Sequence, residues 1–107
     1  MLSRTADNLY WLARYIERAE YMARTLEATI RLSSLPLAYA SGTNEWQSAI
    51  QTSGSVDAFF AYQAEATEEN VTNFLAFSLQ NPGSIRNCIE AARQNARAVR
   101  TALTSAG

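Results

Sequence analysis

The chain has 107 residues, 48% of them hydrophobic, and a formal net charge of −1, which fits one globular domain over residues 1–107 and excludes a disordered chain. The balanced charge argues against a nucleic-acid-binding protein, which would carry a basic excess. Histidine is absent and cysteine occurs once. These counts exclude a Ser-His or Cys-His pair and an intramolecular disulfide, and no metal site or cofactor is predicted.

The first predicted helix spans about residues 5–33. Its apolar side chains alternate at spacings of three and four, which is the pattern of a heptad seam. The seam consists of Leu9, Leu12, Ile16, Ala19, Ala23, Leu26 and Ile30. Ser3 or Thr5 is expected to cap the start of the helix. Arg14 interrupts the first apolar run, so no membrane span is predicted and the cytoplasm is the expected compartment.

Short elements are expected to follow. Residues 34–43 form a connection, because proline and glycine interrupt the periodicity there. A short helix is predicted over 44–53, with Gly54 ending it. Its apolar face is formed by Trp46, Ala49 and Ile50.

The next predicted elements carry most of the remaining aromatic side chains. Ser55 is expected to cap a short turn or helix that contains Phe59 and Phe60. Thr67 precedes two glutamates, which indicates the capped and acidic start of a helix that runs to about Gln80.

The last predicted helix spans about residues 82–103. Either Asn81 caps it, with Pro82 at the first helical position, or Ser84 does. Its apolar residues again repeat at spacings of four and three: Ile85, Ile89, Ala92, Ala96, Val99 and Leu103. Small residues permit close approach of helices, so the first and last helices are expected to touch along Ala19/Ala23 and Ala92/Ala96. The predicted fold is an all-α bundle of four to five helices with these two packed together.

A second stripe on the first helix is a candidate functional surface. It consists of Tyr10, Arg14, Glu17, Tyr21 and Arg24. It forms either a second packing layer under the 34–62 segment or a surface for a partner or ligand. Arg18 lies at the edge of the seam, where its guanidinium group could pair with a carboxylate or stack on an aromatic ring.

The last helix carries a row of arginines, Arg86, Arg93, Arg97 and Arg100, beside one glutamate. The row could pair with the acidic 44–70 segment, or it could receive phosphate or an acidic patch of a partner. Asn95 is a candidate buried hydrogen-bonding residue. Cys88 is interpreted as a partly buried structural thiol.

Two stretches resemble the alpha-E domain family, a bacterial all-helical family with a Glu-Arg motif. The first is MLSRTADNLYWLARYIERAEYMAR, which contains Glu17-Arg18, and the second is NPGSIRNCIEAARQNARAVR. The matching residues of the second stretch are Asn81, Pro82, Ser84, Ile85, Ala92, Arg93, Asn95, Ala96 and Arg97. Gln94 departs from the glutamate usual there. The resemblance implies an N-terminal portion or a shortened relative of longer proteins.

The resemblance also implies a class of function and of partner. Members of the family are encoded beside, or fused to, ATP-grasp ligases and transglutaminase-like proteins, so the leading hypothesis is a non-catalytic module that acts by protein–protein interaction in amide-bond processing. A first alternative is a catalytic component of an amide ligase or hydrolase that uses Glu17 and an arginine cluster. A second alternative is a homo-oligomerisation unit, such as a homodimer. In the leading hypothesis the Glu17/Arg18 and Arg93/Asn95/Arg97 groups pair between helices or face the partner.

Overall fold

The computed structural model describes residues 2–35 and 45–106, with side chains for residues 4–35 and 45–104. The elements in chain order are α1 (Leu2–Ser33), α2 (Glu45–Thr52), α3 (Val56–Phe60), α4 (Glu68–Thr72), the π-helix η2 (Asn73–Phe77) and α5 (Ile85–Ala106). No strand occurs in these ranges. The all-α prediction with long first and last helices is therefore confirmed.

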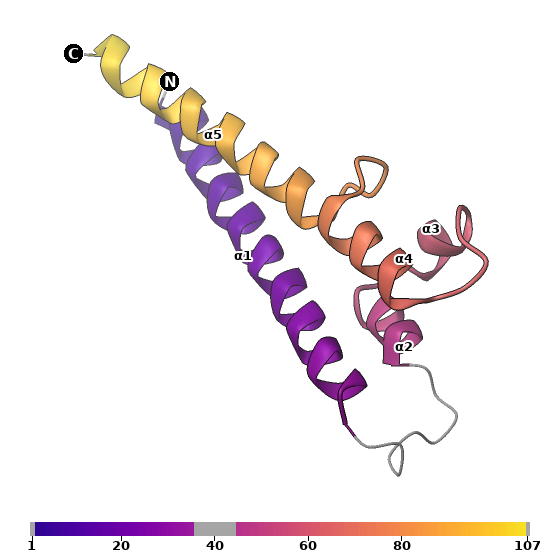
Figure 1. The fold of residues 1–107 in the computed structure, drawn as a ribbon. Helices are drawn as coiled ribbons and strands as arrows, with labels where there is room; N and C mark the ends of the chain where they lie inside the picture. The colour runs from indigo at the N-terminus through magenta and orange to yellow at the C-terminus, as the bar shows by residue number, and fades with distance from the viewer. Residues whose placement is uncertain (1, 36–44, 107) are drawn as a thin grey trace.

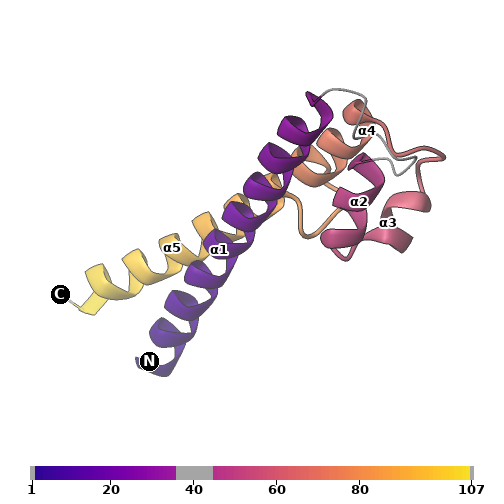
Figure 2. The ribbon, with the colours of Figure 1, turned by 90° about the horizontal axis from the view of Figure 1, so that it is seen from below.

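The two long helices form an antiparallel hairpin, and α2, α3 and α4 gather at one end of it (Figure 1). Seen from below, α1 and α5 cross at an angle and separate toward their free ends, which lie away from the small helices (Figure 2). The molecule measures 62 × 26 × 18 Å along its principal axes. Within the described part of the chain, none of the helices has an apolar stretch long enough for a bilayer crossing.

The ends of the long helices differ from the predicted ones. Helix α1 already begins at Leu2, so the predicted caps Ser3 and Thr5 are wrong. At the start of α5, the Asn87 backbone N–H donates to Ser84 Oγ at 3.2 Å, which identifies Ser84 as the cap. Helix α5 continues to Ala106, beyond the predicted end near 103, because nothing in its last turn breaks a helix.

Gly54 ends α2 as predicted, and the hydrogen bonds explain why. Its N–H donates to Gln51 O at 3.1 Å, and the Ser55 N–H donates to Ile50 O at 3.3 Å. This is the Schellman arrangement, in which the residue after the helix takes a positive φ. Gly54 has φ +73°, a conformation that a residue with a side chain rarely adopts. Ser55 stands at the start of α3, but its side chain does not cap that helix.

Thr67 caps α4 as predicted, since its Oγ1 accepts from the Asn70 N–H at 3.2 Å. The predicted continuation to Gln80 is wrong. The helix changes to π geometry at Asn73 and ends at Phe77, where the Ser78 N–H donates to Asn73 O at 2.8 Å. This i→i−5 bond widens the last turn.

The hydrophobic core lies at the end of the hairpin that the small helices cover. Met22 and Leu26 of α1 contribute to it, together with residues of the small helices and the segments beside them. The other buried members are Trp46, Ala49, Ile50, Phe59, Ala66, Val71, Phe74, Leu75 and Ala76, with Ile85 packed against them. The Phe59 and Phe74 rings meet edge to face with their centroids 5.3 Å apart, a favourable aromatic geometry. The core therefore fixes only one end of the long hairpin.

The seam between α1 and α5 is narrower than the sequence predicts. Its buried side chains are Ala19, Met22, Leu26 and Thr29 on α1 and Cys88, Ala92 and Val99 on α5. Ala19 and Ala92 lie in the seam as expected, but Ala23 and Ala96 are exposed. The apolar arc of each helix is wider than one neighbouring helix can cover, so the outer part of each predicted seam remains in solvent.

Replacing Phe59 with alanine should lower the free energy of unfolding by about 3–5 kcal/mol, because the ring is fully buried and its removal leaves a cavity. Phe60→Ala is the matched control, since that neighbouring ring is 38% exposed and should cost much less. Urea unfolding followed by circular dichroism measures both. Equal losses for the two variants would contradict the position assigned to this core.

Candidate functional site

The Glu-Arg pair lies on the exposed surface of α1. Glu17 forms an ion pair with Arg14 one turn earlier, at 3.6 Å. Arg18 is exposed as well. Every ion pair found between described side chains joins two residues of the same helix. The expected pairing of the Glu17/Arg18 group with Arg93 or Arg97 across the hairpin is therefore not found in this part of the chain.

The stripe of Tyr10, Arg14, Tyr21 and Arg24 is exposed along the side of α1 that faces away from α5. Tyr10 is 56% exposed and Tyr21 is 48% exposed. The Tyr21 hydroxyl donates to Thr52 O at 3.2 Å and so contacts the last turn of α2. Within the described residues, this hydrogen bond joins the stripe to the 34–62 segment, and both tyrosines keep about half of their surface exposed. The part of the 34–62 segment between residues 36 and 44 lies outside the described residues.

The arginines of α5 are also on the surface. Arg93 pairs with Glu90 at 3.6 Å within the helix. The predicted pairing with the acidic 44–70 segment is not found, although all five acidic side chains of that segment are described. The segment lies around the covered end of the hairpin, whereas most of the arginines point outward along it. Asn95 is half-buried, and its Nδ2 donates to Ala91 O at 2.9 Å in its own helix.

Among the described side chains, Cys88 is a buried titratable group. It lies fully buried in the seam, deeper than the partly buried position predicted for it. Burial raises the pKa of the Cys88 thiol, and the positive charge of Arg18 opposes that rise. The arginine of the Glu-Arg pair therefore acts across the hairpin through its charge, because Arg18 belongs to α1 and Cys88 to α5.

Asn81 organises the turn before α5. It is buried, its Nδ2 donates to Phe74 O at 2.9 Å, and its Oδ1 accepts from the Gly83 N–H at 3.0 Å. The first bond satisfies a carbonyl of the π-helix, and the second holds the turn closed. Asn81 thus has a structural position between η2 and α5.

Asn87 completes this turn, although the sequence did not single it out. Its Nδ2 lies within hydrogen-bonding distance of Asn81 O at 2.8 Å, Leu79 O at 3.1 Å and Ser78 O at 3.2 Å. An asparagine on the first turn of a helix that follows an Asn-Pro-Gly turn is the only signal that could have pointed to it.

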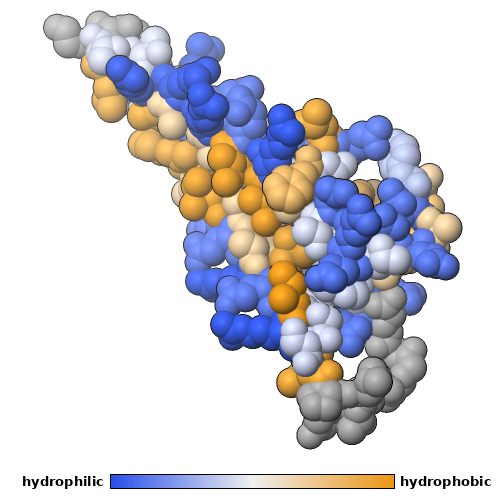
Figure 3. Space-filling model, in the orientation of Figure 1, coloured by the Kyte–Doolittle hydropathy of each residue, from blue (hydrophilic) through white to orange (hydrophobic). Residues whose placement is uncertain are grey.

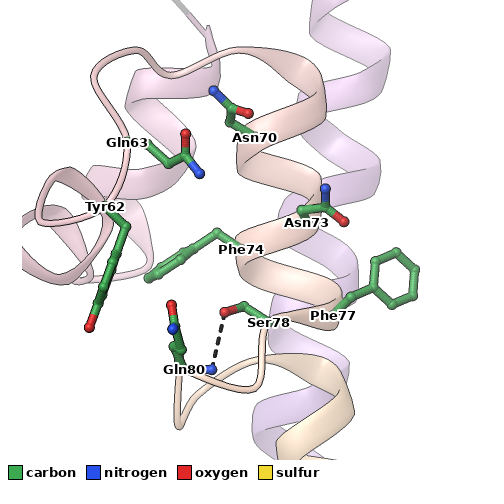
Figure 4. A pocket seen from close by; sticks show the side chains of 8 residues that line it. All are labelled: Tyr62, Gln63, Asn70, Asn73, Phe74, Phe77, Ser78 and Gln80. Carbon is green, nitrogen blue, oxygen red and sulfur yellow. Dashed lines mark hydrogen bonds between the residues drawn. The ribbon is translucent and has the colours of Figure 1, made fainter.

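A surface hollow lies beside the π-helix and has a volume of about 260 Å³. Figure 4 shows the Phe74 ring and Tyr62 directed toward it, with the side-chain amides of Gln63 and Gln80 around them and Phe77 turned away. The Gln80 N–H donates to Ser78 Oγ at 3.2 Å at its edge. No residue of the Glu-Arg pair or of the arginine row lines it.

The second hollow is lined by Gln47, Phe60, Ala64, Glu65, Ala66 and Thr67. A single carboxylate without an opposed base or a positioned nucleophile offers little for acid–base chemistry. Among the described residues, no three cysteine, aspartate or glutamate side chains gather as metal ligands would.

These features define an all-helical domain built on one long hairpin, with a Glu-Arg pair exposed on its first helix. The chain belongs to the Alpha-E family: the model of that family, described as a predicted alpha-helical domain with a conserved ER motif, matches residues 1–106. No curated protein and no solved structure matches the chain significantly.

Asn81→Ala should lower the free energy of unfolding by about 1–3 kcal/mol, because it leaves the carbonyl of Phe74 without its buried partner. Asn73→Ala is the control, since this asparagine of the same region is exposed. Chemical denaturation measures both variants. A loss at Asn81 no greater than at Asn73 would contradict the structural position of Asn81.

The Cys88 thiol should react with iodoacetamide on the order of 100-fold more slowly in the folded protein than in concentrated urea, because it is buried and only the thiolate attacks. Arg18→Gln should shift the pH profile of the folded-state reaction upward, since it removes the charge that lowers the pKa of this thiol. Arg31→Gln, which changes an arginine at the far end of α1, should leave the profile in place. Mass spectrometry of the alkylated protein follows the reaction.

Proposed function

We propose that the protein is a non-catalytic helical module that binds a protein partner through the exposed stripe of α1 in an amide-bond-processing system. The observation that carries the proposal is the exposure of two tyrosines and two arginines in one row on a regular helix. Tyr10, Arg14, Tyr21 and Arg24 form this row.

The chemistry of the stripe suits a protein partner. Tyrosine and arginine are enriched at protein interfaces and among the residues that dominate binding energy. Each of the two arginines has a glutamate of its own helix as a partner, Glu17 for Arg14 and Glu20 for Arg24. Such pairs pre-orient the guanidinium groups, and exposed pairs of this kind are weak enough to be exchanged for a partner's carboxylates.

The class of partner is inferred from the family resemblance. Relatives are encoded beside ATP-grasp ligases and transglutaminase-like proteins, so a ligase of the ATP-grasp type is the proposed partner, with a transglutaminase-like protein as the second candidate. In this proposal the partner supplies the bond-forming chemistry, and the helical module supplies the contact surface.

The catalytic alternative has less support. An acid–base role for Glu17 calls for a recessed site in which the carboxylate meets several arginines and a substrate. Glu17 is exposed and paired with Arg14 one turn earlier, and it lines neither of the hollows described above. The fold around Glu17 therefore favours contact over catalysis.

Tyr10→Ala should weaken binding to a ligase of the ATP-grasp type by about tenfold or more, because it removes a large exposed contact side chain. Tyr62→Ala is the matched control, since this tyrosine is also exposed but follows α3, outside the stripe. Biolayer interferometry with the purified ligase gives both dissociation constants. Absence of binding by the unchanged protein to either candidate partner, or equal loss in both variants, would contradict the proposal.

The Glu17→Gln variant distinguishes the proposed non-catalytic module from the catalytic alternative. A catalytic role requires that this variant bind the ligase normally and lose turnover of the combined system. The proposed module predicts that turnover with saturating Glu17→Gln protein equals that with the unchanged protein.

A further inference from the structure

A second surface of the hairpin is apolar and open. We name it the apolar flank, and it consists of Leu9, Ile16, Ala23 and Ile30 on α1 and Ile89, Ala96 and Leu103 on α5. The exposed fractions of its large side chains are 49% for Leu9, 47% for Ile16, 46% for Ile30, 50% for Ile89 and 65% for Leu103. On each helix these residues follow one another at every seventh position. An unbroken heptad row is typical of helices that pack lengthwise against other helices.

The two rows lie on the same side of the hairpin. On each helix the row is rotated about the helix axis by roughly 80° from the buried seam, counted at about 100° per residue. The rotation has the same sense as the one in which successive residues follow each other along the helix. Because α1 and α5 are antiparallel, equal displacements along the two sequences lead to the same side. Figure 3 shows the resulting band of hydrophobic residues between and along the two long helices.

The chain exposes more surface than a folded monomer of its size. Its accessible surface is 7583 Å², whereas a compact monomer of 11.8 kDa exposes about 5,900 Å². Its radius of gyration is 17.4 Å, against about 13 Å for a compact domain of this length. The excess of roughly 1,700 Å² exceeds the roughly 1,000 Å² per copy that a permanent homodimer buries.

Charged residues border the apolar flank on both sides: along α1 they are glutamates that each pair with an arginine of the same helix, and along α5 they are arginines. Glu20 and Glu27 lie along the outer edge of the α1 row, and Arg86, Arg93 and Arg100 lie along the outer edge of the α5 row. These residues also repeat at every seventh position. Such borders determine which helices can lie side by side in a bundle.

We infer that the apolar flank is the interface for a second copy of this chain, which completes a four-helix bundle around a two-fold axis parallel to the hairpin. In this arrangement α1 of one copy lies antiparallel beside α5 of the other. Contact between Glu20 and Arg93 of the other copy then also brings Glu27 to Arg86, because both pairs are seven residues apart on antiparallel helices. An axis across the hairpin would place α5 beside α5 and one arginine row against the other, which like charges oppose.

The inference goes beyond the proposed function and does not depend on it. The stripe of Tyr10, Arg14, Tyr21 and Arg24 lies on a different side of α1 and stays exposed in the dimer. A protein that does not bind the ligase would therefore not contradict the dimer. A protein that is monomeric would not contradict the proposed ligase-binding surface.

The first test is the mass of the full chain in solution, measured by light scattering across a dilution series. The expected mass is twice 11.8 kDa. Ile16→Glu should raise the dimer dissociation constant by about 100-fold or more, because each dimer would bury two unpaired carboxylates. Leu32→Glu is the matched control: Leu32 is 54% exposed on the same helix but lies off the flank, so the dimer should persist. Circular dichroism checks that both variants keep their helices.

The second test determines which helices meet. Glu20→Arg alone and Arg93→Glu alone should each weaken the dimer, and the two changes combined in one chain should restore it. All these positions are exposed, so the variants should fold. A monomer at every concentration, or a dimer that survives Ile16→Glu, would overturn the inference. Failure of the combined exchange to restore the dimer would overturn the parallel axis.

Discussion

The contact between α1 and α5 combines small side chains with larger ones. Ala19 on α1 and Cys88 and Ala92 on α5 allow a close approach of the two helices, and Met22, Leu26 and Val99 add apolar bulk to the seam. The larger buried side chains lie where α2, α3, α4 and η2 cover the hairpin. The small helices thus fix one end of the long hairpin, and its remaining length stays exposed on the sides that they do not cover.

The same constraint explains why the turn before α5 is so strongly bonded. If the hairpin is fixed from one end, the direction in which α5 leaves that end determines its course along α1. Asn81 and Asn87 fix this direction through carbonyls of η2 and of the turn itself, and Ser84 starts the helix. The first half of the second family signature, which begins at Asn81, therefore connects the small helices to the long hairpin.

The sequence predicts the helices well and their buried faces only in part. Heptad spacing and end signals such as Thr67 and Gly54 locate most of the elements, because these signals act within a few residues. The sequence does not reveal which row of a wide apolar arc is buried, since Ala19 and Ala23 look alike until a neighbour covers one of them. The π-helix accepts a hydrogen bond from Asn81, which lies beyond its end. The expected pairing between helices is not found, and Glu17 and Arg93 instead pair with Arg14 and Glu90 of their own helices.

The separation of the free ends of α1 and α5 has a mechanical consequence (Figure 2). The core around Ile50 and Phe59 holds α1 and α5 together at one end of the hairpin, so the two helices should bend most easily at their free ends. Separation of the tips would unpack the seam around Val99 but leave this core intact. The distance between the free ends of α1 and α5 can then adjust to the shape of a molecule that lies between or against them.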